Sequence, residues 1–131
     1  MPTPTETISR YFAAIRRKDS EDWCACFAAD GIAHDPADAP ARQGRAAHRQ
    51  FFEGVAGLFD DLDFRAGAAF VCGNQAAVHF TARCAAKNGN VAEVAGIDVF
   101  VFDADGLIAS LHGYWDPTPL FVAAGAASGA T

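Results

Sequence analysis

The sequence predicts an α+β fold, in which three N-terminal helices pack on a curved, mostly antiparallel sheet that forms a cone with an apolar pocket. Apolar residues recur with helical spacing as far as Leu58. From Leu62 to Trp115 the pattern becomes one of β-branched and aromatic strands joined by hairpin-length turns. Helices segregated from an antiparallel run of strands are typical of α+β domains with the helices on one face of the sheet.

The first two helices follow from capping residues and apolar spacing. Thr3 is placed to cap the first helix, and Pro4 fits its first turn. Its buried face is formed by Ile8, Tyr11, Phe12 and Ile15. A second, shorter helix begins after Asp19 or Ser20 and ends in residues 28–31. Its apolar side chains are Trp23, Cys24 and Phe27.

A short extended piece at 32–35 leads into a Pro-containing loop at 36–44 and then a third helix at about 45–58. The strands that follow are expected at 62–71, 75–86, 91–102 and 107–115. There is no repeat and no linker, so we expect residues 1–122 to form a single domain. Residues 123–131 are small and featureless, and we expect them to form a flexible tail.

Composition argues against several classes of partner and cofactor. The net charge of −6 leaves no basic surface for nucleic acid or anionic membranes. No apolar run is long enough to span a bilayer, and the N-terminus lacks signal-peptide features, so we expect a cytoplasmic protein. We expect unpaired, buried thiols and no metal, because the four cysteines contain no Cys-x-x-Cys pair and the histidines lack metal-ligand spacing.

The strand at 91–102 contains the most unusual residue of the chain. Side chains alternate across a strand, so Asp98 is the only ionisable group on a face that also carries Val94, Gly96, Phe100 and Phe102. An unpaired carboxylate is costly to bury in such surroundings, so Asp98 is expected to stay protonated or to find a strong partner.

A tight turn at 103–106 predicts the pairing of this strand with the next one. Asp98 is then opposite Leu111, Gly96 opposite Gly113, and Val94 opposite Trp115. Two adjacent glycines leave room above the sheet, which indicates a pocket floor beside Asp98.

The opposite face of the strand carries Ile97, Val99 and Val101 and is apolar as well. Three helices cover only one face of such a sheet, and a second apolar face needs a second cover. We therefore expect a homodimer packed through the outer face of the sheet.

Three segments resemble the ketosteroid isomerase family of the nuclear transport factor two-like superfamily, which also contains the SnoaL-like proteins. They are Ser9-Arg10-Tyr11-Phe12-Ala13-Ala14, His34-Asp35-Pro36 and Gly96-Ile97-Asp98-Val99-Phe100. The resemblance extends in spacing from about Thr5 to Trp115. It implies an isomerase that shifts a double bond beside the carbonyl of a steroid-like or other flat apolar ketone, without a cofactor.

The resemblance also assigns roles. By this resemblance Asp35 is the general base, and Tyr11 and a protonated Asp98 form the oxyanion hole; a neutral aspartic acid in this role is known for this family. The pocket walls are expected to be Phe52, Phe100, Leu111 and Trp115. Phe52 stands where some members of the family have another tyrosine.

Each site residue also has an ordinary structural interpretation. Tyr11 on a helix face is often core, Asp35 before proline is often a turn cap, and Asp98 is within reach of an arginine such as Arg83. His48 is expected on the solvent side of its helix. Two other functions stay open: a related lyase, cyclase or epoxide hydrolase, and a non-catalytic binding module.

Overall fold

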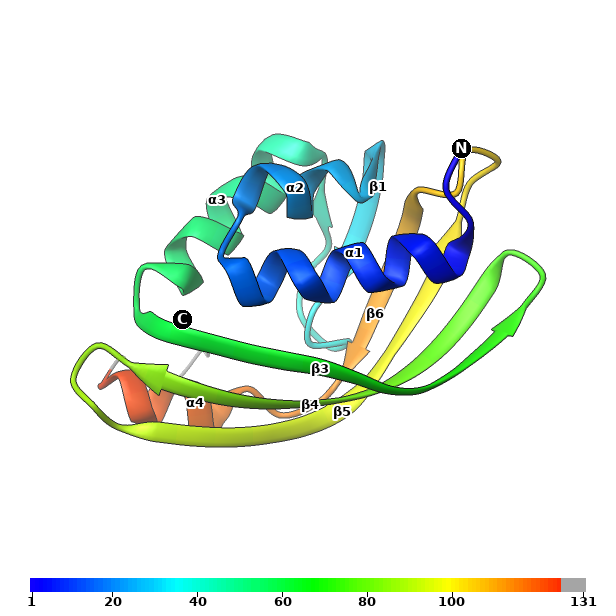
Figure 1. Cartoon of the computed structure of the whole chain (residues 1–131). Helices are drawn as coiled ribbons and strands as arrows, with labels where there is room; N and C mark the ends of the chain where they lie inside the picture. Colours follow the sequence, from blue (N-terminus) through cyan, green and yellow to red (C-terminus); the bar gives the residue numbers. More distant parts are fainter. Residues whose placement is uncertain (126–131) are drawn as a thin grey trace.

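The computed structural model describes residues 1–125, which form one curved sheet with helices on its concave face (Figure 1). The helices are α1 (Pro4–Arg17), α2 (Ser20–Ala25), α3 (Arg45–Ala56) and α4 (Thr118–Ala124). The strands are β1 (Phe27–His34), β2 (Arg42–Gln43), β3 (Phe59–Cys72), β4 (Gln75–Ala86), β5 (Val91–Phe102) and β6 (Ile108–Tyr114). The six strands are ordered β2-β1-β6-β5-β4-β3, and only β1 and β6 are parallel. The predicted α+β class is confirmed.

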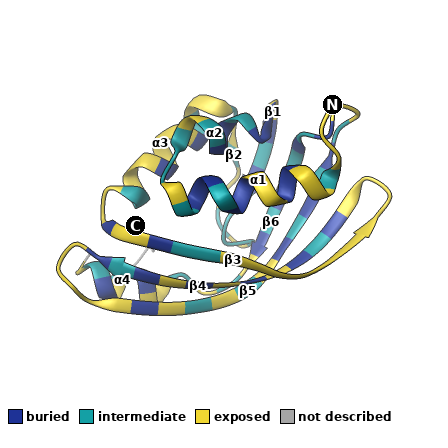
Figure 2. Cartoon of the chain, viewed as in Figure 1, coloured by how far each residue is buried: buried dark blue, intermediate teal, exposed yellow. Residues whose placement is uncertain are grey.

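Helix α1 crosses the concave face of the sheet, and buried and exposed residues alternate along it (Figure 2). Thr3 and Glu6 form a reciprocal capping box at its start, and Lys18 ends it in a left-handed conformation. The buried Thr7 hydroxyl donates to the Gly106 carbonyl at 2.5 Å. Arg16 donates to the Phe64 carbonyl at 2.8 Å. These two bonds fix α1 between the β5–β6 turn and β3.

Two predictions for residues 28–44 are wrong. Residues 28–31, expected to end the second helix, belong to β1, because Phe27 and Ile32–His34 pair in parallel with β6. The expected loop at 36–44 contains the short strand β2, which pairs with β1. The pairing of β1 with β6 joins residues distant in sequence, and the pairing of β2 with β1 lies at a sheet edge. No local sequence pattern indicates either of them.

The predicted register of β5 and β6 is displaced by two residues. Asp98 is opposite Gly113 rather than Leu111, and Leu111 is opposite Phe100. Next to the turn the displacement is one residue, because Phe102 is opposite Ile108 rather than Leu107. An irregularity between Val101 and Phe102 adds the second residue. A shift of two keeps every side chain on its predicted face. Asp98 therefore still points to the concave side, now directly across from a glycine.

Helix α4 follows Pro117 and was not predicted. It contacts β4 and β5, and its Leu120 and Ala123 are buried. Asn88 and Asn90 both donate to the Ala123 carbonyl. The expected domain boundary after residue 122 thus falls inside this helix. Of the predicted flexible tail 123–131, residues 126–131 lie outside the described part of the chain.

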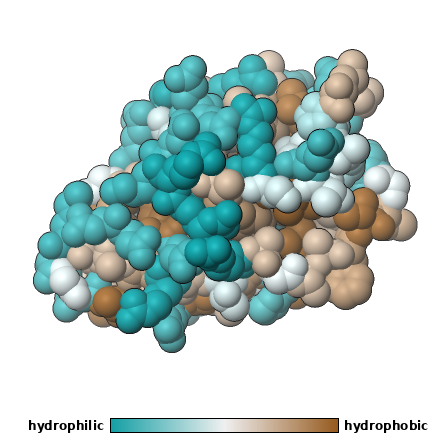
Figure 3. Space-filling model, viewed as in Figure 1, coloured by the Kyte–Doolittle hydropathy of each residue, from teal (hydrophilic) through white to brown (hydrophobic). Residues whose placement is uncertain are grey.

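Apolar side chains remain exposed on the outer face of the sheet and on the β3–β4 hairpin. Ile97 is 44% exposed, Phe70 73% and Val71 47%. In Figure 3 hydrophobic residues gather at the right-hand end of the molecule, while hydrophilic residues dominate over the helices. Cys72, expected to be buried, is exposed beside them, whereas the other cysteines are buried and all are free. Among residues 1–125 no helix is long and apolar enough to cross a membrane.

Thr7 offers a direct test of how α1 is held. Replacing it by valine keeps the shape but removes the only donor found for the buried Gly106 carbonyl, so T7V should lower the free energy of unfolding by about 1–3 kcal/mol. T7S keeps the hydroxyl and should preserve the hydrogen bond. Urea denaturation of the three proteins measures the difference, and equal stability of T7V and T7S would contradict this account.

Candidate active site

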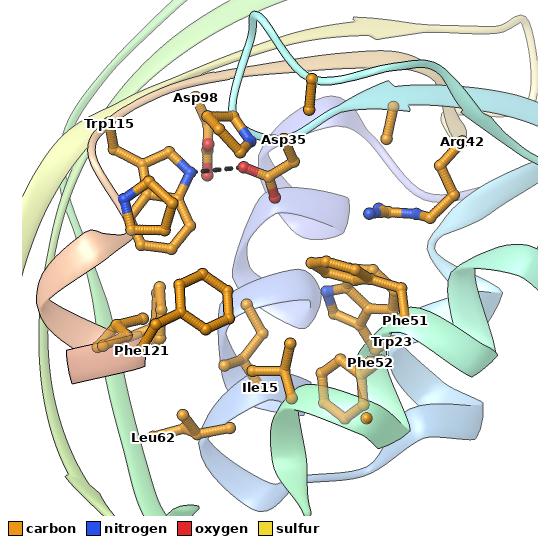
Figure 4. Close-up of a pocket in the computed structure, with 18 of the residues that line it drawn as sticks. Ile15, Trp23, Asp35, Arg42, Phe51, Phe52, Leu62, Asp98, Trp115 and Phe121 are labelled. Carbon is orange, nitrogen blue, oxygen red and sulfur yellow. Dashed lines mark hydrogen bonds between the residues drawn. The ribbon is translucent and has the colours of Figure 1, made fainter. Parts of the chain in front are cut away.

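The concave face of the sheet and the helices enclose a cavity of about 1180 Å³ (Figure 4). Most of its wall is apolar. Its ionisable side chains are Tyr11, Asp35, Asp38, Arg42, Asp98 and Asp116. In the close-up, Asp98 and Trp115 lie on one side, Arg42 and Phe51 on the other, and Asp35 between them. A large apolar cavity with a few converging polar groups is typical of a small-molecule site.

Asp98 extends from β5 into this cavity and is 4% exposed. Within residues 1–125 no hydrogen bond or ion pair to its carboxyl is found. Arg83, the alternative partner, lies 3.8 Å from Glu93 instead and is exposed. Burial raises the pKa of Asp98 well above its usual range, and the neighbouring Asp35 adds to the rise. Both influences favour the neutral form of the Asp98 carboxyl, which has an O–H to donate.

Asp35 directly follows β1, and the Asp35–Pro36 peptide bond is cis. Trp115 Nε1 donates to Asp35 Oδ1 at 2.6 Å (Figure 4), and the loop is tied to β6 by Ala37 N–H donating to the Gly113 carbonyl at 2.7 Å. Burial raises the pKa of Asp35, while the Trp115 hydrogen bond and the charge of Arg42 lower it. Asp35 thus has two influences that favour its carboxylate form, and Asp98 has neither.

Gly113 is what lets the two carboxyls share one space. A Cβ atom there would lie 3.1 Å from Asp98 Oδ1 and in collision with Asp35 Oδ1. Both carboxyls therefore lie against the same glycine backbone. Because two adjacent carboxylates repel each other, ionisation of Asp35 favours the protonated form of Asp98.

Tyr11 reaches the cavity from α1 and is 3% exposed. Its ring packs 5.4 Å from Phe100 and 5.7 Å from Trp23. Burial, followed by the charges of Asp98 and Asp35, raises the pKa of Tyr11 well above its usual value, while Arg42 acts in the opposite direction. The phenol therefore stays protonated and, like Asp98, is a hydrogen-bond donor.

The four predicted wall residues divide into two pairs. Phe52 and Trp115 line the cavity. Phe100 and Leu111, both 0% exposed, lie in the core instead of on the cavity surface. They share the face of Asp98, as the alternation predicted, but α1 covers that part of the sheet: Phe100 packs against the Tyr11 ring.

Sequence reasoning missed three other contributors to the cavity. Trp23 and Phe121 line it from α2 and α4, and Arg42 lines it from β2. Trp23 was placed on a helix but not in the site, and Phe121 belongs to a helix that was not predicted. No local signal marks Arg42, because its position depends on how the 36–44 segment folds back over the cavity.

His48 is buried, which corrects its expected place on the solvent side of α3. Its ring stacks on Phe27 at 4.1 Å. Nε2 lies 3.0 Å from the Gly31 carbonyl, and Nδ1 accepts from Arg42 Nε at 2.8 Å. Residues that approach from β1 and β2 cover this side of α3, so the helix has no fully solvated face here.

The SnoaL-like domain family matches residues 8–111 of this chain. A steroid Δ-isomerase from Nocardioides simplex is 33% identical over 116 residues, covering 88% of this chain and 91% of that protein. The chain therefore belongs to the SnoaL-like family.

Solved structures show the same likeness. A Δ5-3-ketosteroid isomerase from Mycobacterium sp. has a TM-score of 0.79 at 26% identity, covering 90% of this chain and 97% of that one. RV0760c from Mycobacterium tuberculosis, solved with estradiol-17β-hemisuccinate, has a TM-score of 0.78 at 22% identity and covers 87% and 95%. The fold is thus that of nuclear transport factor two-like proteins.

The buried His48 predicts a specific pH dependence of stability. Burial, with the charge of Arg42, lowers its pKa from 6.5 to about 4. The unfolded chain therefore takes up a proton that the folded protein does not, and stability is lost as pH falls from about 6.5 toward about 4. In H48Q this loss should be smaller. Denaturant unfolding across that range measures it, with H79Q at an exposed histidine as control; an unchanged pH dependence in H48Q would refute the assignment.

Proposed function

We propose that this protein is an isomerase that shifts a C=C bond by proton transfer next to the carbonyl of a steroid-like or other flat apolar ketone. The observation that carries the proposal is the convergence of one buried carboxyl, one phenol and one Trp-bonded carboxyl on a single, largely apolar cavity. The similarity of the whole chain to the Nocardioides simplex steroid Δ-isomerase supports the same reaction class.

The proposed reaction uses Asp35 twice. Its carboxylate removes a proton from the carbon between the carbonyl and the C=C bond, and the electron pair moves to the carbonyl oxygen, forming a dienolate. Tyr11 and Asp98 donate hydrogen bonds to that oxygen, where negative charge develops. Asp35 then returns the proton to the far carbon of the former double bond, which leaves a conjugated ketone and the carboxylate.

The two carboxyls suit these different roles. A base must be ionised at the working pH, and Asp35 has a hydrogen bond from Trp115 and the charge of Arg42 to favour ionisation. A donor must be protonated, and Asp98 has only burial and a neighbouring carboxyl. No step of this reaction calls for a cofactor. Phe52 and Trp115 supply apolar walls for the substrate.

The proposal also covers the oligomeric state of the protein, its type of substrate and its cellular location. The exposed apolar side chains of the outer sheet face, among them Ile97, support a homodimer packed through that face. The acidic net charge supports a small-molecule substrate rather than nucleic acid, and the largely apolar cavity wall supports a flat apolar body for that substrate. A cytoplasmic location is part of the same proposal.

The direct test is turnover of a β,γ-unsaturated 3-ketosteroid, followed by the absorbance of its conjugated enone product. D35N should lower kcat by roughly 10²–10⁴-fold, because the amide is not a base. D98N keeps an N–H donor and should lose less than D98A. D30N, at an exposed carboxylate on β1, should match the wild type. An active D35N, or a wild type that binds the steroid without forming enone, would overturn the proposal.

Trp115 gives a second test, through the pH dependence of the reaction. Its indole N–H lowers the pKa of Asp35, so W115F should raise that pKa further. The base then becomes active only at higher pH, and the acid limb of the kcat/KM profile should move upward. A limb that stays in place, or moves to lower pH, would show that Trp115 does not tune the base.

A further inference from the structure

Among the described residues the cavity has one cationic side chain, which lies across from Asp35 and Asp98. Arg42 comes from β2 and points its guanidinium into the cavity (Figure 4). The guanidinium carbon lies 4.1 Å from the centre of the Phe51 ring and 5.6 Å from that of Trp23. The two aromatic rings thus form a platform beneath the positive charge.

Among the described residues, the guanidinium of Arg42 has more N–H donors than hydrogen-bond acceptors. Of its nitrogens, Nε donates to His48 Nδ1 at 2.8 Å, whereas Nη2 is buried without an acceptor. None of the ion pairs within residues 1–125 includes Arg42. Asp35 faces it across the cavity in the close-up. Arg42 as a whole is half-buried, so part of its guanidinium is open to the cavity. A half-buried cation without an ion-pair partner in the described residues favours an anionic ligand.

The side chain is also held in place rather than free to withdraw. His48 Nε2 is tied to the Gly31 carbonyl at 3.0 Å, which makes Nε2 the protonated nitrogen and leaves Nδ1 to accept from Arg42. The His48 ring is itself fixed against Phe27. The guanidinium is therefore oriented in advance, with its outer N–H groups directed away from His48.

We infer that the natural substrate carries a carboxylate, and that Arg42 pairs with it while the ketone is held by Tyr11 and Asp98. The inference rests on the proposed function for the reacting end, and it narrows the substrate class to flat apolar keto acids. A guanidinium matches a carboxylate through two parallel N–H···O bonds, and it is the cavity's only cationic side chain among the described residues.

One rival role for Arg42 is purely electrostatic: it would only help to keep Asp35 ionised. That role would shift the pH profile of the reaction but would not distinguish ligands by their charge. A matched pair of ligands therefore separates the two. Methyl 6-hydroxy-2-naphthoate and 6-hydroxy-2-naphthoate share a flat apolar body and a phenol oxygen for the oxyanion hole, and they differ in the charge at the far end.

The experiment measures Kd for both ligands by calorimetry at neutral pH. The wild type should bind the carboxylate roughly 10- to 100-fold more tightly than the ester, since charged hydrogen bonds are the stronger ones. R42M should abolish that ratio. R42K, which keeps the charge but not the fork, should retain part of it. R49M, at an exposed arginine on α3, should leave it unchanged.

Two results would overturn the inference. One is equal affinity of the wild type for the two ligands, a measurement that needs no variant; the other is an undiminished affinity ratio in R42M. Failure of the isomerase proposal is detected separately, because a wild type that forms no enone can still show or lack the charge preference.

Discussion

The rest of the site depends on one buried carboxyl that has no protein partner among the described residues. Asp98 lies in an apolar cavity next to Asp35, and both burial and that neighbour oppose its ionisation. In water the same group would be a carboxylate and could only accept hydrogen bonds. Here the surroundings favour the protonated form, which can donate. In the proposed reaction, this donor stabilises the enolate oxygen.

The fold supplies that environment through a few specific contacts. Gly113 leaves the space in which both carboxyls fit, and the Trp115 indole holds Asp35 in its orientation. Thr7 anchors α1 to the β5–β6 turn, so that Tyr11 projects over the same cavity. On the far wall His48 fixes Arg42. In the proposed reaction, the donors for the enolate oxygen come from α1 and β5, and the base comes from the end of β1.

The sequence could predict residues whose role follows from local periodicity. Helical spacing put Tyr11 on a buried face, and strand alternation put Asp98 on the concave one. It could not predict the exact register, because the irregularity at Val101 and Phe102 is set by the folded turn. Phe100 lies on the same strand face as Asp98 and was therefore predicted to line the cavity, but helix α1 covers it.

The positions of Arg42 and His48 could not be predicted from the sequence for a different reason. Their positions arise from β2 pairing with β1 and closing over α3, which joins segments with no local pattern in common. A resemblance based on three short segments also says nothing of a residue outside them.

The central claim is that Asp98 is protonated and Asp35 is the more acidic of the two carboxyls. It is tested most directly by NMR titration of the protein with ¹³C-labelled aspartate carboxyls, with the two signals assigned from D98N and D35N. The account predicts that the Asp98 carboxyl remains protonated through neutral pH while Asp35 ionises at lower pH. An ionised Asp98 at neutral pH, or an Asp35 that titrates above it, would contradict the account.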